Sequence, residues 1–116
     1  MRSLLILGLA LAPFAAGATN EKPVTLKSPK TTFATTKTVD AYSLCFVKAL
    51  NKDFPKSSIE AIERGKQISV VDGTRTSAVA VVSDLDDKTG ALVVMHVESD
   101  VQIERDPAVK LAKNCR

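Results

Sequence analysis

The clearest hydrophobic pattern lies between residues 67 and 97, where short valine-rich runs alternate with turn signals. Three such runs are visible: 68–71, 76–82 and 91–97. Branched side chains of this kind suit a pleated strand surface. Asp72-Gly73 follows the first run, and glycine readily takes the positive φ of a tight hairpin turn. A polar loop over 83–90 follows the second run. The stretch therefore predicts an antiparallel β-meander of three to four strands.

Alternation within the second run assigns its two faces. Ala78, Ala80 and Val82 share one face, and small residues there would let a helix pack closely against the sheet. Val101 and Ile103 also alternate, so we expect the last strand to resume after Ser99-Asp100.

A helix is predicted on the N-terminal side of the meander. Asp40 is a suitable N-cap, because its carboxylate accepts from unpaired backbone N–H groups. Apolar residues then recur at helical spacing and define one buried face: Tyr42, Cys45, Phe46, Ala49 and Leu50. Phe54 extends this face, and Pro55 ends the helix.

A second helix is predicted at the C-terminal end. Asp106 precedes Pro107, a pair typical of an N-cap followed by the first helical position. The apolar stripe of this helix consists of Ala108, Leu111, Ala112 and Cys115. The sequence thus predicts an α+β fold in which both helices pack on one face of the sheet.

The segment 57–65 fits two structures. Ser57 and Glu60 match a capping box, and Gly65 would suit the end of a helix. Ile59 and Ala61 also alternate with charged neighbours, however, and Arg64-Gly65 could lie in a hairpin turn. The segment is too short for periodicity to choose between helix and strand.

Each predicted helix places one cysteine on its apolar face, and the chain has two cysteines. In an exported protein an even cysteine count favours a disulfide, here Cys45–Cys115. Such a bridge closes a long loop and would contribute about 4 kcal/mol in the chain-entropy model. Reduced, buried cysteines or a bridge between two chains are the alternatives.

The first 38 residues predict a targeting signal followed by a linker. Residues 1–18 combine a basic start, an apolar run over 4–11 and small residues near Ala18, as in a cleaved signal peptide. Residues 19–38 are rich in Thr, Lys and Pro and predict a flexible linker, with residues 39–116 as a single small domain. The expected localisation is periplasmic or secreted.

The composition argues against some classes of binding partner. The 116-residue chain has a formal net charge of +3, 4% aromatic residues and no Trp. Its basic residues are spread along the chain, and few aromatics are available for base stacking, so a nucleic-acid partner is not expected. The apolar run at the N-terminus is shorter than the roughly 20 residues of a membrane span. The pattern is compatible with a monomer, although sequence does not determine the oligomeric state.

Few residues are candidates for chemistry. His96 is the only histidine and shares strand parity with Glu98, which suggests a histidine at a sheet edge beside a carboxylate. Arg75 lies at the predicted Asp72-Gly73 turn and could grip a carboxylate or phosphate of a partner. The acidic loop 84–90 departs from a calcium-binding loop in its ligand spacing, so we expect a hairpin loop there. No metal site or cofactor site is predicted.

The leading functional hypothesis is a small exported, non-enzymatic binding module for an unknown protein or envelope component. Arg75 and His96 are its candidate contact residues. A small hydrolase or metal-dependent enzyme using His96 with nearby carboxylates is one alternative. A structural protein associated with the cell envelope is another.

Overall fold

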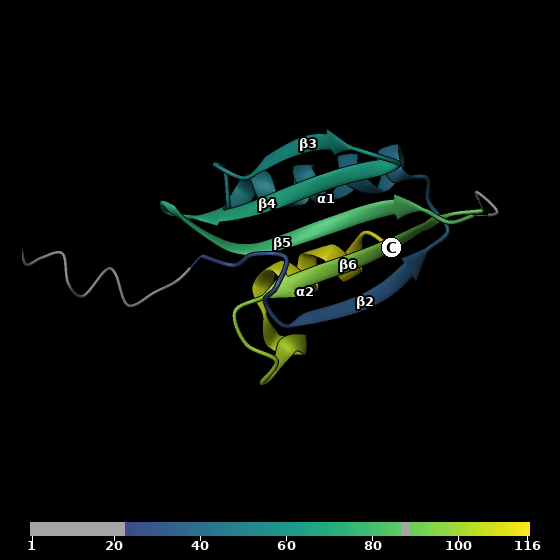
Figure 1. Cartoon of the computed structure of the whole chain (residues 1–116). Coiled ribbons are helices and arrows are strands. Elements are labelled where there is room, and N and C mark those ends of the chain that lie inside the picture. The colour runs from purple at the N-terminus through teal and green to yellow at the C-terminus, as the bar shows by residue number, and fades with distance from the viewer. Residues whose placement is uncertain (1–22, 87–88) are drawn as a thin grey trace, which may run out of the picture.

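A five-stranded antiparallel sheet forms the centre of the computed structural model, which describes residues 23–86 and 89–116. The sheet order is β2-β6-β5-β4-β3 (Figure 1). The strands are β2 (Lys30–Thr35), β3 (Ser58–Ile62), β4 (Gly65–Asp72), β5 (Arg75–Asp84) and β6 (Ala91–Val97). The helices are α1 (Val39–Asp53), the short 3₁₀ helix η3 (Ile103–Arg105) and α2 (Pro107–Asn114). The predicted signal peptide over residues 1–18 lies outside the described residues.

The α+β class is confirmed, but the predicted count of three to four strands is too low. One additional strand is β3, which settles the ambiguous segment 57–65 as a strand. It pairs with β4 through a two-residue turn, with Ile62 opposite Gly65. Arg64 in this turn adopts φ 64°. Gly65 also lies so close to the neighbouring strand that a Cβ atom would sit 1.9 Å from the Val82 carbonyl oxygen. The helical alternative for this segment is therefore wrong.

The other additional strand is β2, which corrects the predicted linker over residues 19–38. Lys30–Thr35 pairs with β6 along its whole length. Apolar residues are sparse in this segment, yet Phe33 and Thr35 alternate with exposed neighbours and are buried. Threonine is favoured in strands, and pairing with β6 supplies the contacts that the isolated segment lacks. Lys30–Thr35 is therefore part of the sheet.

Helix boundaries follow local capping. The N-cap of α1 is Thr38, whose Oγ1 accepts from the Ala41 N–H at 3.1 Å. The expected cap, Asp40, lies instead in the first turn, where its negative charge suits the helix N-terminus. At α2 the predicted cap is confirmed, since Asp106 accepts from the Ala108 and Val109 N–H groups ahead of Pro107.

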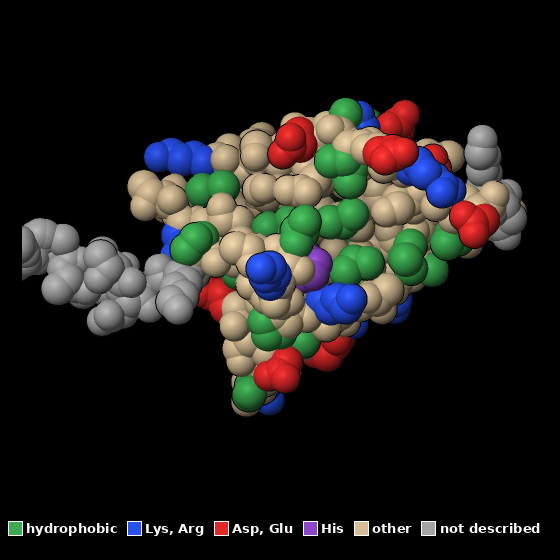
Figure 2. Space-filling model, in the orientation of Figure 1, with side chains coloured by type: hydrophobic (Ala, Val, Ile, Leu, Met, Phe, Trp, Pro, Cys, Tyr) green, Lys and Arg blue, Asp and Glu red, His purple; other side chains and the backbone are tan. Residues whose placement is uncertain are grey.

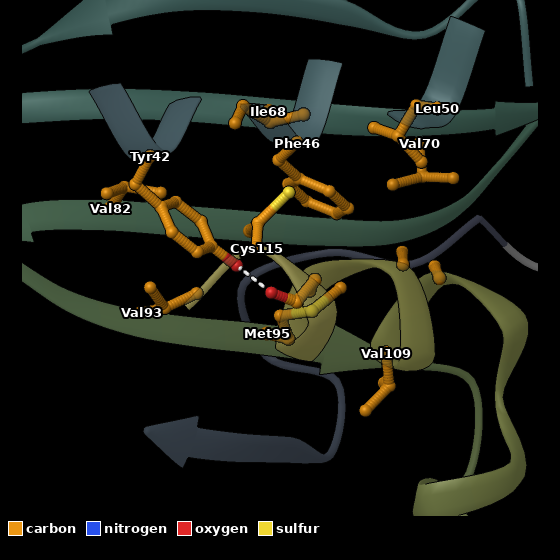
Figure 3. Close-up of a cluster of buried hydrophobic side chains, with 14 of the residues drawn as sticks. Tyr42, Phe46, Leu50, Ile68, Val70, Val82, Val93, Met95, Val109 and Cys115 are labelled. Atoms are coloured by element: carbon orange, nitrogen blue, oxygen red, sulfur yellow. Dashed lines mark hydrogen bonds between the residues drawn. The ribbon is translucent and has the colours of Figure 1, made fainter. Parts of the chain in front are cut away.

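Both helices cover the same face of the sheet, behind the strands in the view of Figure 1. We call this the helix-covered face, and its strands contribute Ile68, Val70, Ala78, Ala80, Val82, Val93 and Met95 to the core. The predicted placement of Ala78, Ala80 and Val82 on one buried face is thus confirmed. Tyr42 and Phe46 of α1 pack into the same core (Figure 3).

The C-terminal end of the chain is tied to α1. The Tyr42 hydroxyl donates to the Ala112 carbonyl oxygen at 2.6 Å (Figure 3), and burial raises the pKa of this phenol above its ordinary value. Cys45 and Cys115 form the predicted intramolecular disulfide. The strand expected to resume after Ser99-Asp100 is wrong, because Gln102 adopts φ 59° and the chain enters η3.

Candidate functional site

Arg75 and His96, the two residues predicted to contact a partner, lie near one end of the sheet, and each makes a contact within the protein. His96 belongs to β6, which is flanked by β2 and β5, so its expected position at a sheet edge is wrong. Its side chain points to the face opposite the helices, which we call the open face and which also carries Val79, Val81, Leu92 and Val94. Figure 2 shows this face, with hydrophobic side chains along its middle next to the histidine.

The N-terminal segment ahead of β2 binds His96 directly. The imidazole Nδ1 lies 3.0 Å from the Ser28 carbonyl oxygen, and only 7% of the residue is exposed. Because a carbonyl oxygen only accepts, Nδ1 is the donor in this contact. Val24, also buried, donates its N–H to the Thr76 carbonyl oxygen in the same region. His96 therefore holds this segment in place.

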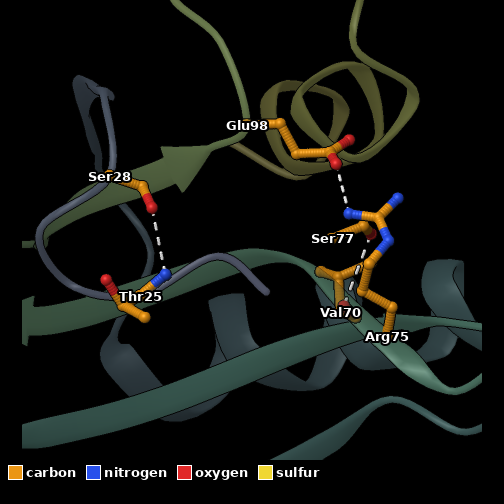
Figure 4. Close-up of polar contacts among 6 residues, drawn as sticks. All are labelled: Thr25, Ser28, Val70, Arg75, Ser77 and Glu98. Carbon is orange, nitrogen blue, oxygen red and sulfur yellow. Dashed lines mark hydrogen bonds and ion pairs between the residues drawn. The ribbon is translucent and has the colours of Figure 1, made fainter. Parts of the chain in front are cut away.

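Arg75 is engaged as well. Its guanidinium forms an ion pair with Glu98, the carboxylate that sequence parity had suggested as the partner of His96 (Figure 4). Nearby, the Ser77 hydroxyl donates to the Val70 carbonyl oxygen at 3.4 Å. The structure thus brings Arg75 and Glu98 together, and it brings His96 to the backbone of residue 28.

A different region presents apolar groups that no element of the described residues covers. We call it the α1–β3 groove, and it is lined by Asp40, Ser43, Leu44, Val47, Ile59 and Lys66. Its volume is about 210 Å³. Leu44 is 63% exposed and Ile59 is 42% exposed, and these side chains come from opposite walls, the helix and the outer strand.

Ser43 is a buried polar residue in the lining of this groove. The residue is 2% exposed, and its hydroxyl oxygen has no hydrogen-bond partner among the described residues. A buried polar group without a partner costs about 1–3 kcal/mol. Ser43 therefore lowers the stability of the fold at the wall of the groove.

The polar end of the groove opens into an adjoining hollow of about 230 Å³. The two share Asp40 and Lys66, and the hollow adds Arg64 and Asp84. Arg64 also pairs with Asp86 at 3.2 Å, through side chains that are both largely exposed. Two acids and two bases therefore border one end of an apolar groove.

Among the described residues, no group of three or more His, Cys, Asp or Glu side chains is arranged to hold a metal ion. The acidic segment after β5 connects β5 to β6, as expected for a hairpin loop. No helix in residues 23–86 or 89–116 has the length and apolar character needed to cross a membrane.

Fold and site together define a small disulfide-bonded α+β domain with an apolar groove at one sheet edge. Comparison with protein-family models, with curated proteins and with solved structures finds no match for this chain. The disulfide itself is typical of proteins that fold in oxidising compartments outside the cytoplasm.

Sequence reasoning did not find the groove. One signal was present, because Leu44 is a large apolar residue outside the predicted buried face of its helix. A single exposed leucine is common on protein surfaces. Its meaning here comes from Ile59 and the unpartnered Ser43, which only the fold brings beside it.

Proposed function

We propose that this protein is a non-enzymatic binding module that acts outside the cytoplasm and binds its partner through the α1–β3 groove. The observation that carries the proposal is a groove walled by the exposed apolar side chains of Leu44 and Ile59, with the buried Ser43 in its lining. Mostly apolar concave sites with a few polar groups are typical of binding sites.

Export is part of the same proposal. The Cys45–Cys115 disulfide favours an oxidising compartment, and residues 1–18 have the composition of a signal peptide. Mass spectrometry of the protein recovered from its producing organism tests this point. A mature chain beginning near Thr19 is expected, and a full-length reduced chain would contradict export.

The enzymatic alternative has less support. It requires His96 to act as a base toward a bound substrate, within reach of a nucleophile or water. The His96 ring is largely buried against the segment around Ser28, and the nearby carboxylate of Glu98 pairs with Arg75. Neither observation favours a reaction at this position.

The binding proposal is tested with variants of two exposed leucines. Leu44→Asp places a charge in the groove, and Leu26→Asp places the same charge at a leucine that is 54% exposed outside it. Immobilised wild-type protein and both variants are exposed to fractions of the organism's envelope and medium. We expect one component to bind saturably to wild type and to Leu26→Asp, with at least about tenfold weaker binding to Leu44→Asp.

The result is read from a dose-dependent isotherm of the purified component, with circular dichroism confirming that both variants are folded. Equal binding to all three proteins would show that the groove is not the recognition site. The absence of any saturable component would contradict the binding function itself.

A further inference from the structure

The outer side of β3 is an unpaired sheet edge. In the sheet order β2-β6-β5-β4-β3, β3 has β4 as its only partner strand among the described residues. Backbone groups in an antiparallel pair alternate in direction, so about half of the β3 residues turn their N–H and C=O groups away from β4. Sheet edges are commonly protected by short strand length, charged side chains, proline or a bulge. The β3 sequence, Ser-Ile-Glu-Ala-Ile, contains no lysine or proline and one charged residue, Glu60, and its pairing with β4 is regular.

The side chains of β3 present different chemistry on its two faces. Ile59 faces the groove beside Leu44. The neighbouring residue, Glu60, points to the open face, because it pairs with Gln67 on the strand next to it. Glu60 is exposed and forms no ion pair among the described residues. A strand added beside β3 would therefore meet an apolar row on one face and a negative charge on the other.

We propose that β3 accepts an extended segment of a partner protein as an additional antiparallel or parallel strand. This inference rests on the proposed function and specifies the class of partner. The added segment alternates apolar and polar residues, with an apolar side chain against Ile59 and Leu44 and a lysine or arginine beside Glu60. Main-chain hydrogen bonds supply affinity in such complexes, and alternate side chains supply specificity.

Charge argues against a second copy of this chain as the occupant. Glu60 is the middle residue of β3. Centred antiparallel pairing of two β3 strands would place one Glu60 directly opposite the other, and like charges in that position destabilise a strand pair. A basic residue on a different protein makes the opposite, favourable pair.

The test uses the full mature protein and a displayed library of random linear peptides about 12 residues long, which is long enough to cover the five residues of β3. We expect enriched peptides to alternate apolar and polar residues and to contain a basic residue. A synthetic copy of an enriched peptide should protect β3 amides from hydrogen exchange. N-methylation of its alternate backbone amides should weaken binding several-fold, because each blocked amide loses one hydrogen bond.

Three variants test the geometry of the complex. Glu60→Lys should weaken the basic peptide about tenfold and should favour a version in which its basic residue is replaced by glutamate. Leu44→Asp should abolish binding of both versions, whereas Leu26→Asp should leave both unchanged. Circular dichroism verifies that each variant is folded.

Several outcomes would overturn the inference. These are a library without enriched peptides, enriched peptides that tolerate every N-methyl substitution, and exchange protection outside β3. Concentration-dependent dimers that compete with peptide would identify a second copy as the occupant instead. If peptides fail while the organism's own component still depends on Leu44, strand addition is wrong and the binding function stands.

Discussion

The two edges of the sheet differ in how they are covered. At β2, Phe33 packs against the Tyr42 ring at a centroid distance of 6.3 Å, and the Arg116 guanidinium lies 5.7 Å from the centre of the Phe33 ring. Lys37, just after β2, donates to the Cys115 carbonyl oxygen. At β3, Ile59 and Leu44 remain exposed beside the α1–β3 groove.

The difference shows that the stabilising contacts of this small domain are concentrated at one edge of the sheet. The C-terminal residues cover one edge, which is also preceded by Pro29 and begins at Lys30, residues typical of protected edges. The other edge has no covering element among residues 23–86 and 89–116, and its strand contains neither lysine nor proline. Changes near β2 should therefore alter stability, and changes near β3 should alter binding.

The largest expected effect comes from removing the disulfide. Replacing Cys45 and Cys115 by alanine should lower the free energy of unfolding by about 4 kcal/mol, because the bridge closes a loop with a sequence separation of 70 residues. Urea unfolding followed by circular dichroism measures this loss, and reduced wild-type protein is the control. Native-state hydrogen exchange should show β2 losing protection before β3. Equal losses at the two edges would contradict the asymmetry.

The next largest effect is a difference in lost stability between two variants, each of which truncates one apolar residue at one edge. Phe33→Ala should destabilise the protein by about 3 kcal/mol or more, since it removes a buried aromatic ring. Ile59→Ala removes a side chain that is half exposed and should cost under about 1 kcal/mol. Denaturant midpoints of the two variants provide the comparison. Similar losses would mean that β3 is as closely packed as β2.

A smaller effect is expected from Tyr42→Phe, which removes the hydroxyl that joins α1 to the Ala112 carbonyl oxygen. The loss should be about 1 kcal/mol near neutral pH. Burial raises the pKa of Tyr42 above its ordinary value near 10. The unfolded phenol therefore ionises first, so the wild-type free energy of unfolding should fall as pH rises above about 10.

Tyr42→Phe should lack this alkaline decline. Tyr42 is the only tyrosine in the chain, so the tyrosinate absorbance reports its ionisation directly. An ordinary titration in the folded protein would contradict burial of the hydroxyl.

The smallest effect has the opposite sign. Ser43→Ala removes a buried hydroxyl that has no partner, so stability should stay unchanged or rise by up to about 1 kcal/mol. Ser77→Ala is the control, because its hydroxyl donates to the Val70 carbonyl oxygen and its loss should destabilise slightly. Thermal unfolding of both variants is the measurement. A clear destabilisation by Ser43→Ala would show that the hydroxyl has a structural role.

Hydrophobic periodicity predicted the elements that are buried on a clear face. The helical spacing of Tyr42 and Phe46, and the valine-rich runs of β4 to β6, identified most of the core. The cap at Asp106 was evident because proline follows it. These signals are local, so each element can be predicted from its own segment of the sequence.

Predicting the two edge strands requires information about contacts between distant parts of the chain. In β2 the buried positions are one phenylalanine and one threonine, and their burial depends on β6 and on the C-terminal residues. Predicting the groove requires even more long-range information, since Ser43, Ile59 and Lys66 belong to three different elements. That Ser43 lacks a partner is a property of the packed structure, which no residue pattern encodes.

The connectivity of the disulfide also bears on how quickly the chain folds. The bridge joins a residue shortly after β2 to a residue beyond β6, while the β2–β6 pairing itself connects distant parts of the chain. In the oxidised unfolded chain the shortest covalent path between these strands runs through the sulfur atoms, which lowers the closure entropy of their pairing. Since non-local contacts slow folding, we expect the oxidised chain to refold faster than the reduced one, with β2 pairing to β6 as soon as the meander of β4, β5 and β6 has formed.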